Sequence, residues 1–356
     1  MRLGIFGWSQ SGKTTVFEAL TGAGAAAGHP PAGKTHIGVA RVEDERVDFL
    51  AGVFKPKKIS YASVEYIDLP GLVSGSNAHE ANPKALGDVR QAEALIAVVR
   101  AFEDPTVANP FETVDPVRDF RRLMDELVFA DLEVADRRIA RLEVDITKPT
   151  SHQKDDAFEL ACLRRVKAAL EEGNSVSSIE MTELEDKATR GFRFLSAKPI
   201  LVLLNLGEEA IGRPSPAGEA QFSRPTVPIF AKLELELSQL SSEDRAAFMT
   251  DLGLKGLAAG EVIRKGYEIL DQISFLTAGD KEVRAWTIHR GTPAVQAAGA
   301  IHSDMERGFI RAEVVAWDKL VAAGSFGKAR ERAEVRMEGK DYVVQEGDVM
   351  QIRFNV

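Results

Sequence analysis

Residues 3–15 read Leu-Gly-Ile-Phe-Gly-Trp-Ser-Gln-Ser-Gly-Lys-Thr-Thr, and this stretch decides the fold. Gly7, Gly12, Lys13 and Thr14 match the pattern G-x-x-x-x-G-K-[ST], which is the spacing of a phosphate-binding P-loop. The two glycines let the backbone wrap tightly, so that successive N–H groups point at a phosphate. The sequence therefore predicts a nucleoside triphosphate site near the N-terminus.

The flanks of this loop have the context that a P-loop needs. Leu3–Phe6 is a short apolar run typical of a buried strand, and Thr14–Leu20 predicts the start of a helix. Lys13 is expected to reach the β- and γ-phosphate oxygens, and the Thr14 hydroxyl to bind Mg²⁺. The alternative is a glycine-rich turn without a ligand, which the strand–loop–helix order disfavours. The candidate nucleotide-binding residues here are Gly7, Trp8, Ser9, Gln10, Ser11, Gly12, Lys13, Thr14 and Thr15.

Composition limits the class of protein. The 356 residues are 44% hydrophobic and 28% charged, which is typical of a soluble globular protein with two to three domains. The net charge of −9 argues against a globally basic nucleic-acid binder, although it allows a local basic patch. The single cysteine, Cys162, excludes an internal disulfide and is expected to pack within a helix. We find neither a signal peptide nor an apolar run of membrane-spanning length, so we expect a cytoplasmic protein.

Two kinds of sequence pattern alternate along the chain, short apolar runs typical of strands and longer segments with helical periodicity. Apolar runs suited to strands of a parallel α/β sheet occupy residues 64–68, 94–99, 200–204 and 225–230. Between the second and third of these, residues 118–146 and 155–172 have helical periodicity, with a break near Pro149, and predict an antiparallel helical hairpin. We therefore expect one nucleotide-binding domain formed by residues 1–116 and 195–275, interrupted by a helical insertion at 117–194.

A third unit is expected over residues 276–356. Its predicted strands are 283–289, 309–317, 342–345 and 349–354, with a helix at 292–302 and a turn at 346–348. The pattern indicates a small mixed β/α module.

A second motif follows the run at 64–68. Asp68-Leu69-Pro70-Gly71 fits a Walker-B aspartate that binds Mg²⁺, followed by a glycine near the γ-phosphate. Thr35, in the loop 30–35, is a third candidate Mg²⁺ ligand that would close a switch over the γ-phosphate. The alternatives are a plain strand-exit turn at Asp68 and an ordinary loop threonine at Thr35.

Base recognition is expected in the loop after residues 200–204, at the carboxyl edge of the sheet. This loop reads Asn205-Leu206-Gly207-Glu208, whereas GTPases of this architecture usually carry N-K-x-D, whose aspartate binds guanine. Here the lysine is replaced by Leu206, and the longer Glu208 takes the acidic place, which no longer favours guanine. Asn205 capping a helix is the alternative. Ala231 and Lys232, just after the run at 225–230, complete the candidate nucleotide-binding residues.

With these motifs the chain resembles the YchF/Obg-like ATPase family, whose members are related to translation-factor GTPases but prefer ATP. The N-x-x-E of Asn205 and Glu208 is the hallmark of that family, and Arg100-Ala101-Phe102-Glu103 also matches. The likeness covers essentially the whole chain and includes residues 282–288, 296–299, 304–313, 338–342 and 353–356. The resemblance implies a P-loop domain, a helical insertion and a C-terminal ubiquitin-like β-grasp module (a TGS domain) associated with RNA and ribosome contacts.

Departures from the family pattern fall in the loops around the phosphates. Gln10-Ser11 replaces the usual Asn-Val, and residues 32–37 and 76–82 differ from the usual switch sequences. Leu72 occupies the position of the water-orienting glutamine of small GTPases, which predicts slow hydrolysis. Asn109 aligns with a histidine that other members use in hydrolysis.

Two histidines lie in the predicted switch loops. A neutral imidazole of His79 or His36 could position the attacking water, and a surface histidine without such a role is the alternative. The candidate catalytic residues are therefore Lys13, Leu72 by its position, and His79.

The leading hypothesis is an ATP- and Mg²⁺-dependent switch that hydrolyses ATP slowly and acts on the ribosome, RNA or a protein. A GTPase of the same fold and a nucleotide-gated binding module with negligible hydrolysis are the alternatives. Residues 277–356 hold 12 basic and 12 acidic residues, so charge alone does not indicate RNA binding. Arg284, Trp286, His289 and Arg290 could contact RNA from one strand, unless Trp286 belongs to the core.

Overall fold

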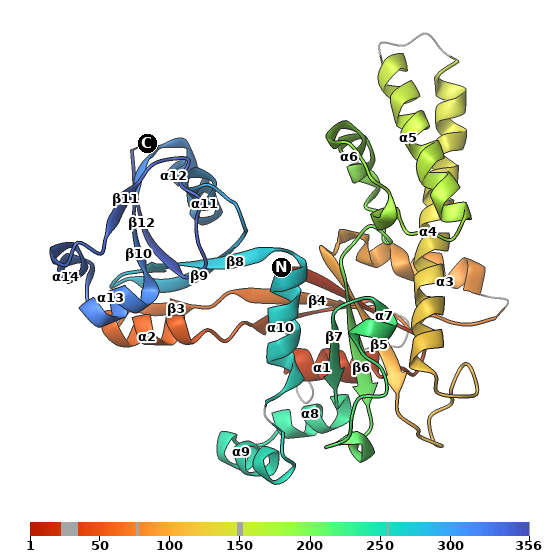
Figure 1. Ribbon diagram of the computed structural model, residues 1–356, viewed down its shortest axis with the longest axis horizontal. Helices are drawn as coiled ribbons and strands as arrows, with labels where there is room; N and C mark the ends of the chain where they lie inside the picture. The colour runs from red at the N-terminus through yellow and green to blue at the C-terminus, as the bar shows by residue number, and fades with distance from the viewer. Residues whose placement is uncertain (23–34, 76–77, 148–151, 255, 356) are drawn as a thin grey trace. The chain divides into compact units, whose positions relative to one another are not determined.

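The computed structural model describes residues 1–22, 35–75, 78–147, 152–254 and 256–355, which form two compact units (Figure 1). The larger unit comprises Arg2–Gly38 and Glu65–Val262, and the smaller comprises Met1, Val39–Val64 and Ile263–Val356. The predicted loop at 30–34, the switch residues 76–77 and the break at Pro149 lie outside the described residues. No helix among the described residues is long and apolar enough to cross a membrane.

A six-stranded sheet forms the centre of the larger unit. Its order is β2-β4-β1-β5-β6-β7, and the neighbours from β4 to β7 are parallel. The strands are β1 (Arg2–Phe6), β2 (His36–Arg41), β4 (Ser63–Asp68), β5 (Ala94–Ala101), β6 (Ile200–Leu206) and β7 (Thr226–Ile229). Five of the six were predicted and are confirmed. β2 was not, because its exposed residues alternate with less exposed ones and include no continuous apolar run.

Helices follow the strands as a parallel sheet requires. They are α1 (Lys13–Thr21), α3 (Ala78–Gly87), α7 (Glu219–Phe222), α8 (Ala231–Ser238), α9 (Ser242–Asp251) and α10 (Ala258–Ile269), with single 3₁₀ turns η1 (Asp88–Gln91) and η4 (Glu208–Ala210). The core beneath them is a cluster of buried apolar side chains that joins the sheet to α3 and α4 and includes Leu72, Leu86 and Leu123.

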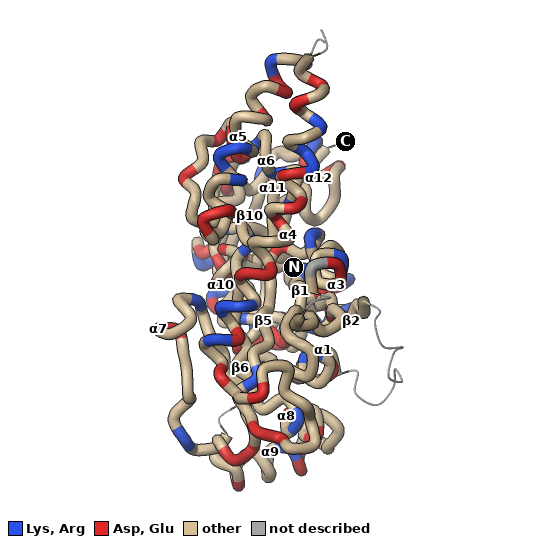
Figure 2. Tube along the Cα trace, turned by 90° about the vertical axis from the view of Figure 1, so that its right-hand side faces the viewer, with Lys and Arg blue, Asp and Glu red and all other residues tan. Residues whose placement is uncertain are grey.

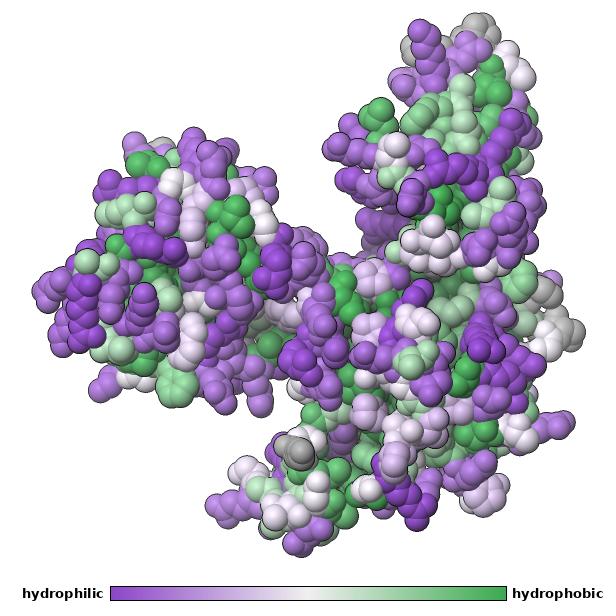
Figure 3. Space-filling model, viewed as in Figure 1, coloured by the Kyte–Doolittle hydropathy of each residue, from purple (hydrophilic) through white to green (hydrophobic). Residues whose placement is uncertain are grey.

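The predicted helical hairpin is confirmed. It consists of α4 (Pro116–Asp145) and α5 (Gln153–Glu171), followed by η2 (Val176–Ser178), α6 (Glu183–Thr189) and η3 (Arg190–Phe192). Asp115 caps α4, and apolar side chains including Ile139, Leu142 and Leu163 pack between the two helices. Cys162 is buried in α5, as expected. Basic and acidic residues are interspersed along the hairpin, and its visible face is largely hydrophilic (Figures 2 and 3).

A second six-stranded sheet forms the smaller unit, in the order β11-β10-β12-β8-β9-β3. If β8 to β12 are numbered 1 to 5 along the chain, their order in the sheet is 2-1-5-3-4. Strands 1 and 5, which are β8 and β12, are parallel neighbours, and this is the β-grasp arrangement. The strands are β3 (Lys58–Ser60), β8 (Gln272–Ala278), β9 (Glu282–His289), β10 (Phe309–Ala316), β11 (Arg336–Glu338) and β12 (Asp348–Phe354). The helices are α2 (Glu45–Phe54), α11 (Ala294–Ile301), α12 (Ser303–Arg307), α13 (Trp317–Ala323) and α14 (Phe326–Glu331).

One predicted strand of this unit is wrong. Residues 342–345 make only an isolated bridge between Pro293 and Val343. The Tyr342 hydroxyl and the Gln345 N–H both donate to the Asp348 carboxylate, at 2.7 and 2.9 Å, so the chain turns before β12 instead of pairing along its length. The turn predicted at 346–348 is present, with Gly347 at φ +80°.

Candidate nucleotide site

The P-loop connects β1 to α1 in the larger unit. Gly12 has φ +89°, and a Cβ at this position would lie 2.2 Å from the Asn205 amide nitrogen, so only glycine fits. Gln10 also adopts the left-handed region, with φ +63°. Strain of this kind collects at ligand-binding loops, where the surrounding structure holds it in place.

Lys13 and Asp68 form the buried charged centre of the site. The Lys13 ammonium donates to the carbonyl oxygen of Trp8 at 2.7 Å, and burial lowers its pKa to about 8 despite the opposing effect of Asp68. Burial also raises the pKa of Asp68, against the opposing effect of Lys13 and His36. Thr14 Oγ1 lies 3.4 Å from Asp68 Oδ2, while Asp68 Oδ1 is buried without a hydrogen-bond partner.

The D-x-x-G segment is fastened to the P-loop. The Leu72 N–H donates to the Gly7 carbonyl at 3.0 Å, and the Ser9 N–H donates back to the Leu72 carbonyl at 2.9 Å. A Cβ at Gly71 would lie 2.7 Å from Ser9 Cα and 3.1 Å from Lys13 Nζ, so this glycine allows the close approach. Leu72 itself is fully buried in the apolar core, where its side chain cannot orient water.

A pocket of about 510 Å³ adjoins the P-loop. Glu208 and Lys232 supply exposed charges on its wall, and both polar and apolar side chains supply the rest of the lining. Its other lining residues include Gln10, Gly12, Thr15, Phe102, Glu103, Asp104, Val107, Asn205, Leu206, Phe230 and Leu233. A cleft in which apolar side chains pack against a ligand and polar groups orient it is the usual form of a small-molecule site.

Asn205 connects three loops of the site. Its amide nitrogen donates to the Ser11 carbonyl at 3.0 Å, and its side-chain oxygen accepts from the Ala231 N–H at 3.3 Å. The predicted alternative, a helix cap by Asn205, is wrong, because Gly207 occupies the cap position of η4. Asn205 therefore holds the P-loop against the start of α8, and Glu208 is the acidic residue of the N-x-x-E motif that lines the pocket.

The remaining candidates lie as follows. The Thr35 hydroxyl donates to the Asp88 carboxylate in η1. His36 Nδ1 lies 3.9 Å from Asp68 Oδ2, and its Nε2 is buried without a partner. His79 lies in α3, and its side chain is outside the described residues. Asn109 Oδ1 accepts from the Phe111 N–H at 2.9 Å in a turn.

The site is tied to the first helix of the hairpin. Trp8 packs edge-on against Phe111, and its indole N–H donates to the Asp119 carbonyl of α4 at 2.9 Å. Asn82 of α3 holds both backbone groups of Val73, just after the D-x-x-G segment, and donates to Glu126 of α4 at 2.8 Å. The P-loop thus contacts α4 directly, and the chain just after the D-x-x-G segment is linked to α4 through Asn82.

Comparison with known proteins identifies the family. The chain is 37% identical over 367 residues to the "Ribosome-binding ATPase YchF" of Bacillus subtilis (strain 168), covering 99% of each chain. The chain belongs to the YchF family. A YchF protein of Haemophilus ducreyi bearing the same name is also 37% identical, covering 100% of this chain and 99% of that protein.

Structure and family models agree with this. The structure of the Schizosaccharomyces pombe YchF GTPase matches with a TM-score of 0.83 and 27% identity, over 99% of this chain and 97% of that one. The model described as a 50S ribosome-binding GTPase matches residues 2–129, and the YchF C-terminal model, described as a protein of unknown function, matches residues 272–355.

Sequence reasoning missed the wall of the pocket formed by residues 102–107. Arg100 organises this loop, because its guanidinium donates to the carbonyls of Phe102, Asp104, Val107 and Ala108 and lies over the Phe102 ring. The available signal was an arginine at the carboxyl end of the apolar strand at 94–99, next to the nucleotide edge of the sheet.

Proposed function

We propose that this protein binds ATP with Mg²⁺ and hydrolyses it slowly, as a switch whose state changes its binding to a macromolecular partner. The observation that carries the proposal is the combination of a P-loop centred on Lys13 with Glu208, in place of an aspartate, on the wall of the adjoining pocket. A carboxylate one methylene longer and without the preceding lysine has lost the geometry that selects guanine.

The residues present fit Mg²⁺. Thr14 and Asp68 offer a hydroxyl and a carboxylate side by side, with Asp68 Oδ1 free of any protein partner. The described residues contain no cluster of three or more His, Cys, Asp or Glu, which agrees with a site where phosphate oxygens and water complete the ligand set. When bound, Mg²⁺ neutralises phosphate charge during transfer. We propose Thr35 as a further ligand, which requires it to leave Asp88.

Each protein group then has a defined part. P-loop amides and Lys13 hold the phosphates, and the negative charge of a triphosphate would raise the lowered pKa of Lys13 and keep it protonated. Glu208 and the loop at 102–107 would hold the base, and Asn205 would position the loops around it. Gly71 would contact the γ-phosphate, and Leu72 leaves water unoriented, which makes turnover slow.

The partner and location are proposed from the relatives. Those proteins are named ribosome-binding ATPases, and the match to them extends over 99–100% of this chain. We therefore propose a ribosomal or RNA partner and a cytoplasmic location. The contacts from Trp8 and Asn82 to α4 would carry the nucleotide state into the hairpin at 117–194. In the C-terminal unit, Arg284 lies 3.9 Å above the Trp286 ring, and Trp286 packs partly into the core, which limits RNA stacking there.

The first experiment measures the dissociation constants of ATP and GTP with Mg²⁺, together with single-turnover hydrolysis of each. We expect tighter binding of ATP, slow cleavage, and a shift of at least about tenfold toward GTP in the double variant Leu206→Lys/Glu208→Asp, which restores N-K-x-D. Glu243→Asp, at an exposed carboxylate of α9 that does not line the pocket, is the matched control and should leave the preference unchanged. A wild-type preference for GTP would contradict the proposal.

The burial of Leu72 favours one second candidate, a nucleotide-gated binding module. Tight ATP binding without any cleavage, at the same enzyme concentration, would support that function in place of hydrolysis.

A further inference from the structure

A second polar cleft lies in the larger unit, at the amino-terminal ends of the parallel strands, whereas the P-loop lies at their carboxyl ends. It has a volume of about 580 Å³ and is lined by residues that precede β5 and β6 and by the segment from η2 to η3. Three of its lining residues are cationic, namely Arg190, Arg193 and Lys198. The P-loop, by contrast, lies at the carboxyl end of β1, so the two sites share no residues.

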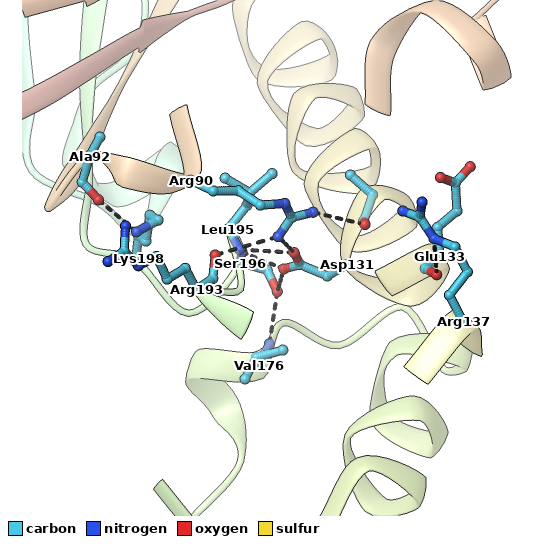
Figure 4. Close-up of polar contacts among 11 residues, drawn as sticks. Arg90, Ala92, Asp131, Glu133, Arg137, Val176, Arg193, Leu195, Ser196 and Lys198 are labelled. Atoms are coloured by element: carbon cyan, nitrogen blue, oxygen red, sulfur yellow. Dashed lines mark hydrogen bonds and ion pairs between the residues drawn. The ribbon is translucent and has the colours of Figure 1, made fainter. Parts of the chain in front are cut away.

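Two of these cations have no carboxylate partner. The Lys198 ammonium donates to the carbonyl oxygen of Ala92 at 2.6 Å, and Arg193 donates to the side-chain oxygen of Gln91. Among the described residues neither forms an ion pair, whereas the nearby Arg90 is paired with Asp131 (Figure 4). Burial lowers the pKa of Lys198, and the guanidinium groups of Arg193 and Arg90 lower it further, against the opposing effect of the Asp131 and Glu93 carboxylates.

The acidic residues of the cleft are already engaged. Asp186 is paired with Arg190 at 2.7 Å, and Glu93 accepts the N–H of Arg2 at 3.0 Å. The three cations of the lining outnumber its two carboxylates, so the cleft keeps a surplus of positive charge at Arg193 and Lys198. A surplus of positive charge in a cleft attracts anions.

The wall that carries these cations is rigid. Asp131 of α4 is fully buried and accepts from the N–H groups of Leu195 and Ser196, at 2.9 and 2.7 Å, and from Arg90 at 2.7 Å. The Ser196 hydroxyl bonds both Asp131 and the Val176 N–H, which fixes the segment between Arg193 and Lys198 (Figure 4). Because the wall is held in this way, the two cations are prepositioned for a ligand.

Apart from Thr189, the rest of the lining is apolar. Val176, Ile179, Met181 and Phe194 face the cleft beside the cations. A nucleotide unit has the matching composition, with a phosphate for the cations and a sugar and base for the apolar wall. We propose that this cleft binds a phosphate-bearing ligand of nucleotide chemistry, held by Arg193 and Lys198. The source is either an RNA strand or a free phosphorylated molecule.

The test uses the full chain carrying Lys13→Ala, so that the P-loop does not take up the probe. Two probes are titrated, a single-stranded RNA of twelve nucleotides and inorganic pyrophosphate. Binding of RNA but not pyrophosphate identifies a strand, and comparable binding of both identifies a free phosphorylated ligand. Either result supports binding in the cleft only if the double variant Arg193→Gln/Lys198→Gln weakens binding of the probe by about tenfold or more. For RNA, the variant should also lower the slope of log affinity against log salt concentration by about 1.4.

Arg137→Gln is the matched control. Arg137 is exposed, donates only to the carbonyl oxygen of Glu133, and points away from the cleft (Figure 4). Its loss should leave binding unchanged, and the double variant should keep the wild-type Tm. Binding of neither probe, an unaffected double variant, or an equal loss in Arg137→Gln would each overturn the proposal. The proposed ATP switch would survive any of these outcomes, because its own test depends on the P-loop and Glu208.

Discussion

Two buried aspartates of the larger unit make opposite use of the same chemistry. Asp131, in α4, is fully buried and both of its oxygens accept hydrogen bonds, from Arg90, Leu195 and Ser196. Asp68, at the end of β4, is 3% exposed and has one oxygen without any partner. A saturated buried carboxylate stabilises the fold, whereas an unsaturated one is held ready for a ligand.

The surroundings of the two groups extend this contrast. Around Asp68, Ser11 Oγ and His36 Nε2 are also buried without hydrogen-bond partners, so unmet polar groups collect at the nucleotide site. Around Asp131, the polar groups bond to one another and join α4 to the chain that returns to β6 (Figure 4). Unmet hydrogen bonding therefore separates the candidate functional site from a structural one more clearly than charge or burial does.

The largest expected effect is the loss of Asp131. Asp131→Ala leaves Arg90 and two backbone N–H groups without their acceptor, and should lower the free energy of unfolding by about 3–5 kcal/mol. Asp136→Ala is the control, because Asp136 is on the same helix but forms a half-exposed ion pair with Lys167. It should cost about 1 kcal/mol or less. If urea unfolding showed the same loss of unfolding free energy for Asp131→Ala and Asp136→Ala, the stabilising role assigned to Asp131 would be wrong.

Asp68→Asn should act in the opposite direction on stability. Because burial disfavours the Asp68 carboxylate, replacing it by an amide should leave the ligand-free Tm unchanged or raise it by about 2–4 °C. ATP affinity measured with Mg²⁺ should fall by about 100-fold, while affinity measured with EDTA should change little. A clear drop in the ligand-free Tm would show that Asp68 is structural, like Asp131.

The smallest effect concerns a third buried carboxylate. Glu234 in α8 accepts the N–H of Ala258 at the start of α10 with both oxygens, at 3.0 and 2.9 Å, and burial raises its pKa to about 7. The folded pKa lies above the unfolded value, so protonated Glu234 stabilises the fold below pH 4.5 and this contribution is lost as the pH rises through about 7.

Glu234→Gln tests this directly. The difference in unfolding free energy between wild type and variant should fall by about 2 kcal/mol from pH 4.5 to 8, with a slope of at most about 1.4 kcal/mol per pH unit. Glu236→Gln, at an exposed site two residues away on the same helix, should show no such slope. Parallel pH profiles for wild type and Glu234→Gln would contradict the assignment.

Local patterns predicted much of this molecule. The P-loop, the strand ending at Asp68 and the two helices of the hairpin depend on the spacing of glycines, apolar runs and helical repeats within a few turns of chain. Contacts between distant residues were not predictable in the same way. Residues 39–64 contribute α2 and β3 to the smaller unit, beside strands that lie more than two hundred residues later.

The sequence by itself determined the chemistry of the nucleotide site, because a P-loop, a following D-x-x-G and an N-x-x-E are each short and self-contained. Only the tertiary structure decided what several of these residues do. Asn205 fastens the P-loop across 194 residues, and Leu72 is buried in the core instead of facing the phosphates. Asp131 meets Ser196 across 65 residues. Burial and hydrogen-bond saturation depend on every neighbour at once, and no local spacing records them.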